Sequence, residues 1–134
     1  MVIPFDLGTT NRVGARFGPS AIRQASRMLA DGDHPLHWVN PSAMPVADIG
    51  NFTIALGDIA RSLVAIEEQA IHIKHLVALG GDHGITLPLL RALAKRHDRP
   101  ALIHFDAHSI LGRRTSAKPM LTVRSSIMPS RMDW

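Results

Sequence analysis

Short apolar runs that end in Asp or Gly recur along this chain and constrain its fold more than any other feature. They span Val2–Asp6, Val46–Gly50, His75–Gly81 and Pro100–Asp106. Short, continuous apolar runs are typical of strands buried on both faces of a parallel sheet. We therefore expect these runs to form neighbouring parallel strands in one sheet.

A helical pattern follows the first expected strand and its glycine-containing loop. Gly18-Pro19-Ser20 opens this pattern, because proline is well tolerated in the first turn of a helix. Ile22, Ala25 and Leu29 then predict an inward-facing stripe, and the helix is expected to end near Asp31.

Further helical patterns precede and follow the third expected strand. From Leu56 to Ile73 the apolar positions are three and four residues apart, as on one face of a helix that covers a sheet. Another helix is expected from about Leu87 to Lys95-Arg96-His97, whose cations suit a helix C-terminus. Alternating strands and helices predict an α/β fold, a three-layer α/β/α sandwich around a parallel sheet.

Length and composition indicate one globular domain. The chain has 134 residues, of which 46% are hydrophobic and 19% charged, and it has no cysteine. Disulfides and thiolate sites are thereby excluded, so any metal must use His, Asp or Glu. No apolar stretch is long enough for a membrane span and the first residues do not resemble a signal peptide, so we expect a cytoplasmic protein without a membrane partner.

The net charge of +4 comes from the C-terminal residues. Met1–Ile110 holds 10 Lys and Arg against 10 Asp and Glu, whereas Leu111–Trp134 holds five basic residues against Asp133 alone. Aromatic residues are not interleaved with these basic residues, so we expect no nucleic-acid partner.

The third expected strand runs directly into Gly80-Gly81-Asp82-His83. Open α/β sheets bind ligands at the carboxyl ends of their strands, and the glycines permit a sharp exit that would turn His83 into such a crevice. A plain turn with a surface histidine is equally consistent with the spacing alone.

The fourth expected strand ends in Asp106-Ala107-His108. Residues two apart in extended backbone share a face, so Asp106 and His108 are expected on the same side. A carboxylate and an imidazole without sulfur suit a divalent ion such as Mn²⁺. Two strand ends that each deliver Asp and His predict a metal site more strongly than either does alone.

These motifs resemble those of the ureohydrolase family of arginases, agmatinases and formiminoglutamases, and their sequences are most similar to those of agmatinases. Gly80-Gly81-Asp82-His83 and His104-Phe105-Asp106-Ala107-His108 carry the resemblance most specifically, and it covers Val2 to Ser109. Pro4-Phe5-Asp6 and Gly14-Ala15-Arg16-Phe17-Gly18-Pro19 resemble the opening motif of the family.

The resemblance implies a homo-oligomeric enzyme that hydrolyses a guanidinium group to urea and an amine with two Mn²⁺ ions that bridge a hydroxide. His83 and His108 would each be a ligand of one ion, and Asp106 would bridge the two. Asp82 would orient its surroundings without binding metal. The remaining histidines are expected on the surface or in packing contacts; they are His34, His37, His72, His75, His97 and His104.

The sequence departs from the family pattern after Ser109. The family motif is Asp-Ala-His-x-Asp, and Ile110 stands where the last aspartate, also a metal ligand, is expected. The second half of the family sequence, with a further Asp-x-Asp ligand motif, has no counterpart here. The resemblance therefore implies an incomplete metal site and an inactive polypeptide.

Leu111–Trp134 has no apolar periodicity. If the codons of Ile110-Leu111-Gly112 are ATA, CTT and GGG, a G inserted before them turns these residues into Asp-Thr-Trp. The same shift permits the family's His-Gly-Thr further on. We expect residues 1–109 to be the N-terminal half of a ureohydrolase domain and 110–134 to be a poorly ordered basic tail that arose from a frame error. A natural divergent tail is the alternative.

The function expected from the resemblance is hydrolysis of agmatine to putrescine and urea, within polyamine metabolism. One alternative is a relative that acts on guanidinobutyrate, arginine or another guanidino compound. A second is a non-catalytic subunit that associates with full-length homologues. Metal content separates these classes, because the enzyme needs two ions per chain and a structural partner needs none.

Overall fold

The structure is a computed structural model that describes residues 1–29, 32–34, 36–103 and 105. Asp106, His108, Ile110 and the tail after Ser109 lie outside these residues. The expectations for them therefore stay predictions.

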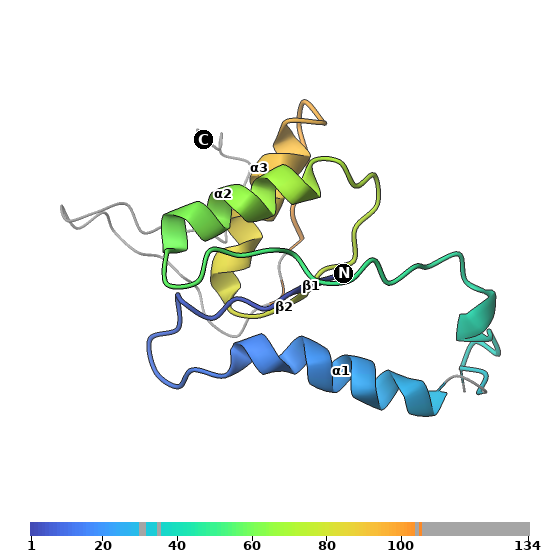
Figure 1. Cartoon of the computed structure of the whole chain (residues 1–134). Coiled ribbons are helices and arrows are strands. Elements are labelled where there is room, and N and C mark those ends of the chain that lie inside the picture. Colours follow the sequence, from blue (N-terminus) through green and yellow to red (C-terminus); the bar gives the residue numbers. More distant parts are fainter. Residues whose placement is uncertain (30–31, 35, 104, 106–134) are drawn as a thin grey trace.

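A short parallel sheet lies at the centre of the described chain (Figure 1). Strands β1 (Val2–Ile3) and β2 (Leu79–Gly80) pair in parallel, with Val2 opposite Leu79. On the other edge of β1, the Val2 amide donates to the Gly50 carbonyl at 3.0 Å, and the Phe52 amide donates to the Val2 carbonyl at 2.8 Å. The parallel pairing of the first and third expected strands is confirmed, although both are shorter than expected.

The other two expected strands are not formed in the described residues. Val46–Gly50 contains no strand, and the parallel contact beside it is a single bridge between Val2 and Asn51. Residues 100–103 and 105 are also outside any strand, and Phe105 is 93% exposed. A strand buried on both faces needs a hydrogen-bonded neighbouring strand and other elements that cover each face. An apolar sequence indicates such a strand, but it cannot provide these partners.

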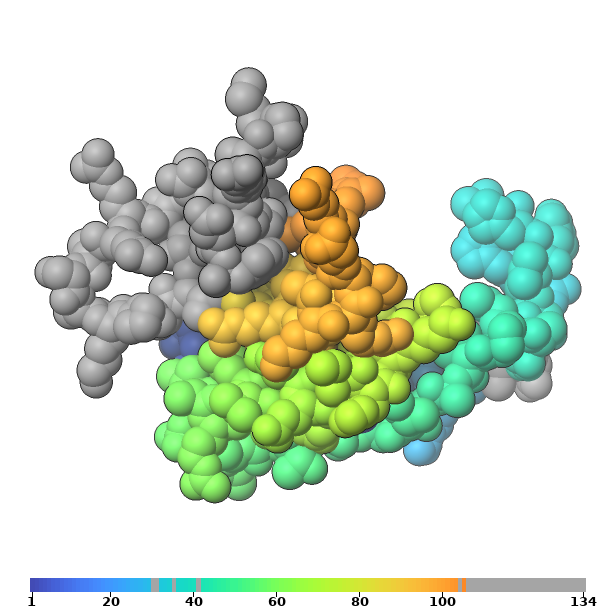
Figure 2. All heavy atoms as spheres, turned by 90° about the horizontal axis from the view of Figure 1, so that it is seen from above, coloured from blue at the N-terminus to red at the C-terminus, as the bar shows by residue number. Residues whose placement is uncertain are grey.

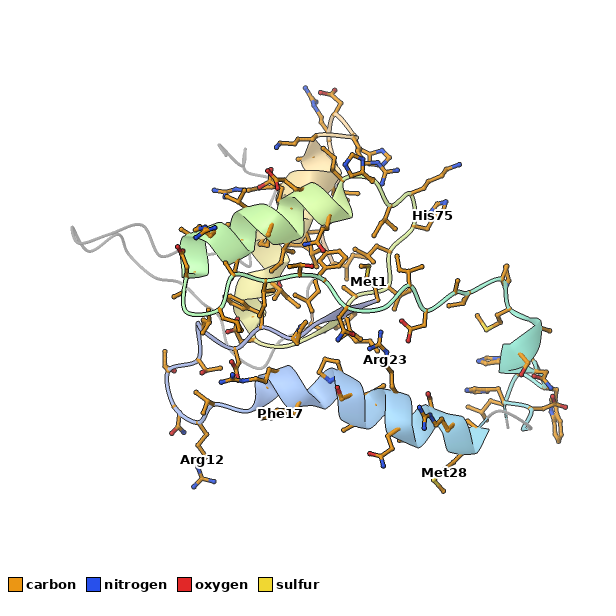
Figure 3. The ribbon with its side chains drawn as sticks, in the orientation of Figure 1. Met1, Arg12, Phe17, Arg23, Met28 and His75 are labelled. Carbon is orange, nitrogen blue, oxygen red and sulfur yellow. The ribbon has the colours of Figure 1, made fainter. Side chains whose placement is uncertain are left out.

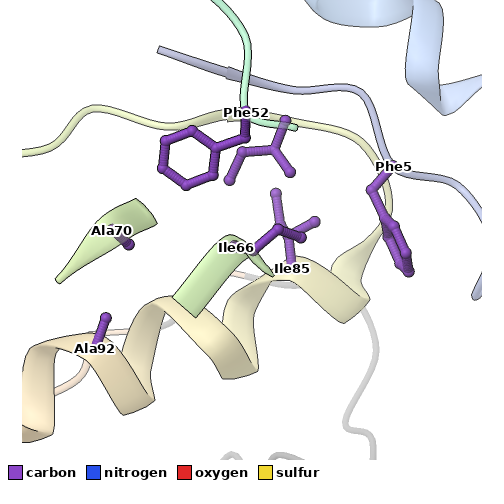
Figure 4. Packing of buried hydrophobic residues seen from close by; sticks show 7 residues of the cluster. Phe5, Phe52, Ile66, Ala70, Ile85 and Ala92 are labelled. Atoms are coloured by element: carbon purple, nitrogen blue, oxygen red, sulfur yellow. The ribbon is translucent and has the colours of Figure 1, made fainter. Parts of the chain in front are cut away.

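Two helices cover one face of the sheet and form the core. Helix α2 (Ile59–Ala70) starts at Asp58, whose carboxylate accepts a hydrogen bond from the Arg61 amide at 2.9 Å. Helix α3 (Thr86–Ala94) follows the short 3₁₀ helix η4 (His83–Ile85) and packs on α2. The core between helices and sheet is shown in Figure 4; its buried residues are Ile3, Phe5, Phe52, Ile66, Ala70, Ile85 and Ala92.

The basic end expected for the third helix is confirmed. Helix α3 ends at Ala94, directly before Lys95-Arg96-His97. The Lys95 ammonium lies 2.5 Å from the Glu67 carboxylate on α2, and the Arg96 guanidinium donates to the Ile73 carbonyl. The cations therefore connect the ends of the two helices as well as complementing the helix dipole.

Helix α1 (Gly18–Ser26) lies on the opposite side of the sheet, which gives the three layers that were predicted (Figure 1). The 3₁₀ helix η1 (Ala15–Phe17) precedes it and η2 (Arg27–Leu29) continues it. The predicted inward stripe is wrong, because Ile22 is 49% and Leu29 65% exposed, and Ala25 is exposed too.

The reason is that α1 docks through other residues. Pro19 is buried, and the Arg23 guanidinium donates to both oxygens of Asp48 at 2.6 Å, from Nε and Nη2. Arg23 also donates to the Asn51 side chain. One ion pair and the first turn therefore determine which face of α1 meets the rest of the protein.

The connection between α1 and the bridge at Asn51 extends away from the layers (Figures 1 and 2). It contains the 3₁₀ helix η3 (Pro41–Ala43) and exposed apolar side chains such as Trp38, whose φ is 52°. Within the described residues, the helices are too short and too polar to cross a lipid bilayer.

Candidate functional site

The candidate site lies at the edge of the sheet where both strands end. Since β1 and β2 are parallel, the loop after Ile3 and the turn after Gly80 leave the sheet at the same edge (Figure 1). Ligand sites of open α/β sheets occur at this edge.

A glycine makes the exit from β2 possible. Gly81 has a φ of 57°, and a Cβ atom there would lie 2.3 Å from the Phe5 carbonyl oxygen and 2.8 Å from that of Ile3. The next amide, of Asp82, donates to the Phe5 carbonyl at 2.8 Å. The sharp exit predicted from the paired glycines is therefore confirmed, and it brings Asp82 and His83 to the carboxyl edge.

His83 is the first residue of η4 and its side chain is exposed at this edge. Its expected companions, Asp106 and His108, lie outside the described residues. Within the described residues, no three His, Asp or Glu side chains converge in a group that could hold a metal ion. The role of His83 as a ligand therefore stays a prediction.

Both carboxylate oxygens of Asp82 are engaged by backbone amides. Oδ2 accepts from the Gly8 amide at 2.8 Å, and Oδ1 accepts from the Gly84 amide at 2.6 Å. Each carboxylate oxygen thus has one backbone donor, and the two donors hold the side chain in one orientation. This geometry supports the orienting role that the resemblance implies for Asp82.

Asp6 is a second carboxylate of this edge, and its role was not predicted. It is 3% exposed, and its Oδ2 accepts from the Gly14 amide at 2.9 Å and from Arg16 Nε at 2.8 Å. Burial alone would raise its pKa, but the Arg16 hydrogen bond and charge and the Gly14 amide outweigh it, so the pKa is lowered. The signal in the sequence was an aspartate at a strand end followed by Gly14-Ala15-Arg16.

The loop from Gly8 to Gly14 is held by both carboxylates, at Gly8 by Asp82 and at Gly14 by Asp6. Arg12 lies at its tip, and Figure 3 shows that side chain pointing away from the protein. The Thr9 hydroxyl donates to the Asp6 carbonyl at 2.9 Å. The loop therefore starts and ends on fixed contacts, while residues 10–13 are exposed.

The other described histidines do not join this site. His34 and His37 stack on each other, with ring centroids 4.9 Å apart, in the extended connection. His75 precedes β2 and lies at the other end of the sheet (Figure 3). His72 and His97 are exposed as well, and His104 lies outside the described residues.

The relatives found by comparison with known proteins agree with one another on the family. A model of the arginase family matches residues 1–121, a range that runs past Ser109, where the resemblance in motif wording was expected to end. An agmatinase from Cronobacter sakazakii is 44% identical over 113 residues, which cover 80% of this chain and 37% of that protein. The chain thus spans well under half the length of this relative.

Solved structures agree with the fold. A hypothetical agmatinase from Burkholderia thailandensis is 39% identical with a TM-score of 0.77, over 84% of this chain and 38% of the other. The proclavaminate amidino hydrolase from Streptomyces clavuligerus is 30% identical with a TM-score of 0.72, over 83% and 38%. The arginase-like α/β fold is therefore confirmed over part of its full length, and the chain belongs to the arginase family, in which it most resembles agmatinases.

Proposed function

We propose that this chain carries part of a binuclear metal site that hydrolyses a guanidino compound to urea and an amine. The observation that carries the proposal is the glycine exit after β2, which presents His83 at the carboxyl edge of a parallel sheet in a member of the arginase family. The relatives imply a pair of metal ions, and we propose Mn²⁺ because the expected donors are nitrogen and oxygen without sulfur.

The described residues fit this group in one respect that the structure records. His83 is exposed at the edge, and an imidazole nitrogen is a common metal ligand. His83 would hold one ion, His108 the other and Asp106 both. The metal pair, when bound, supplies a hydroxide at neutral pH for attack on the guanidinium carbon.

Agmatine is the substrate we propose, with putrescine and urea as products, in the cytoplasm and within polyamine metabolism. The support is that the similar sequences carry the name agmatinase. The likeness to a proclavaminate amidino hydrolase favours, as second candidate, a different guanidino substrate, such as guanidinobutyrate or arginine.

We further propose that the 134-residue chain binds Mn²⁺ weakly and releases no urea from agmatine, because Ile110 replaces an expected ligand aspartate. A non-catalytic subunit that binds full-length homologues would contain no metal at all. Metal content after dialysis against Mn²⁺ separates these two cases: a weakened site retains some Mn²⁺, and a protein without a metal site retains none.

The test of the site is Mn²⁺ titration followed by paramagnetic broadening of histidine ring signals. We expect His83→Ala to abolish the specific broadening at this edge and His75→Ala, an exposed histidine at the other end of the sheet, to preserve it. Ile110→Asp should raise the affinity for Mn²⁺, whereas Leu111→Asp, one residue away, should not. Equal Mn²⁺ binding by wild type and His83→Ala would refute the proposed site.

A further inference from the structure

The carboxylate of Asp82 joins two segments that are 74 residues apart in the sequence. Its Oδ2 holds the Gly8 amide in the loop after β1, and its Oδ1 holds the Gly84 amide within the turn that carries His83. Hydrogen bonds from amides to an ionised carboxylate are shorter and stronger than those between neutral groups. One side chain therefore fixes the position of the histidine turn relative to the neighbouring loop.

The backbone on both sides approaches this carboxylate too closely for larger residues. A Cβ atom at Gly8 would lie 3.2 Å from Oδ2 of Asp82, and one at Gly84 would lie 2.8 Å from Oδ1. Glycine at both positions lets the backbone enclose the carboxylate. Because the backbone lies this close, the carboxylate of Asp82 accepts hydrogen bonds from two amides and not from solvent alone.

The loop is held at its far end by the second carboxylate. Asp6 accepts from the Gly14 amide and from Arg16, so the segment from Gly8 to Gly14 begins on Asp82 and ends on Asp6. A loop whose two ends are fixed loses much of its conformational freedom before any ligand arrives. The loop that Asp82 holds through the Gly8 amide is thus preorganised.

We propose that Asp82 is a positioning residue, which sets the His83 turn against the loop Gly8–Gly14 and thereby preorganises His83 for metal. It acts through the backbone and binds no ion itself. This inference rests on the proposed function, because it assigns a purpose to the bridge only if His83 binds metal.

Asp82→Asn separates the two hydrogen bonds of Asp82: the bridge to the Gly8 amide, and the cap of η4 through the Gly84 amide. Asparagine has the same size, and its side-chain oxygen still accepts from the Gly84 amide, as N-cap residues do. Its NH₂ group would face the Gly8 amide, and two donors cannot bond, so the bridge is lost. Asp58→Asn is the matched control, because Asp58 caps α2 through the Arg61 amide.

We expect Asp82→Asn to accelerate hydrogen exchange of the Gly8 amide and to lower the NMR order parameter of the His83 amide, in the full chain without metal. With Mn²⁺ added, the affinity at His83 should fall by about tenfold, the lower end of the range for groups that orient metal ligands. Asp58→Asn should change none of these three quantities.

The results distinguish the two proposals. If wild-type protein shows no Mn²⁺ broadening at His83, the proposed function fails, while the metal-free exchange and order parameters still decide whether the bridge fixes the turn. If Asp82→Asn frees the Gly8 amide but His83 keeps its order and its Mn²⁺ affinity, Asp82 has a structural role alone and the positioning role is overturned.

Discussion

Gly81 and Gly57 both have a positive φ, of 57° and 78°, but their surroundings differ. A Cβ atom at Gly81 would meet the carbonyl oxygens of Phe5 and Ile3, whereas nothing lies within 4 Å of one at Gly57. The same substitution at the two sites therefore separates backbone strain from steric conflict.

Gly57→Ala should lower the free energy of unfolding by roughly 1–3 kcal/mol, the usual cost of a left-handed conformation in a residue with a Cβ atom. Gly81→Ala should lower it further, because β1 and the exit of β2 must also move apart. Urea denaturation of both variants measures the difference. Equal losses would show that the contact with Phe5 relaxes without cost.

Asp48 provides a prediction on pH. The Arg23 hydrogen bonds, followed by the Gly50 amide, lower the pKa of Asp48 to about 2. A carboxyl with a lowered pKa in the folded state contributes stability above its unfolded value of about 3.9, and that contribution is lost as the pH falls through about 2. The attachment of α1 should therefore weaken between about pH 4 and pH 2.

A carbon NMR titration of the Asp48 carboxyl tests this directly. The midpoint should lie near 2 in the wild type and rise toward about 3.9 in Arg23→Ala. Arg27→Ala, which removes an exposed arginine one turn further along, should leave it unchanged. If the midpoint of Asp48 is unchanged in Arg23→Ala, the ion pair is not the cause of the lowered pKa.

The roles of individual residues could be predicted from the sequence where they depend on the conformation of neighbouring residues alone. The exit at Gly80-Gly81 could be predicted because left-handed backbone favours glycine. The role of Asp6 was not predicted, because its partners Gly14 and Arg16 lie eight and ten residues further along, before and within η1, and the path of the chain between them is not set by local sequence alone. Convergence of His83 with Asp106 and His108 stays a prediction.

Among the elements, α2 and α1 were each predicted in part. The helix expected from Leu56 forms over Ile59–Ala70, and Leu56 is 84% and Ile59 45% exposed. The periodic apolar face of α2 buries Ile66 and Ala70 against α3 and the sheet. The stripe of α1 had a similar period, yet Ile22 and Leu29 are exposed. Periodicity identifies a helix, but an ion pair such as Arg23–Asp48 can decide which face docks, and its two residues are distant in sequence.

Ile66 and Val64 test where the stability of α2 comes from. Ile66 is fully buried and Val64 is 54% exposed on the other face of the same helix. Ile66→Ala should cost about 2–5 kcal/mol, because it leaves a cavity in the core. Val64→Ala should stay within about 0.5 kcal/mol of wild type. Thermal and urea unfolding measure both, and similar losses would contradict the observed core.

At the scale of the whole molecule, the order of strands and helices predicted the fold class and its layers. The alternation from β1 to α3 required parallel pairing, and the pairing of Val2 with Leu79 is parallel. The lengths of the strands could not be predicted, since a run such as Val46–Gly50 becomes a strand only where neighbouring chain completes its ladder. The sequence thus specified the arrangement better than the extent of the sheet.

The proposed frame error makes a prediction about the complete enzyme. Insertion of one nucleotide before codon 110 should replace Ile110 by aspartate, restore the His-Gly-Thr that follows in the shifted frame, and continue into the remaining ligands. We expect the product to bind two Mn²⁺ ions per chain and to release urea from agmatine, because a hydroxide shared by two ions needs the full ligand set. Ile110→Asp in the present frame should raise Mn²⁺ affinity without activity, which separates one ligand from the whole site. A stop codon directly after the insertion, together with the same tail in a close relative, would show instead that residues 110–134 are a genuine element of this protein.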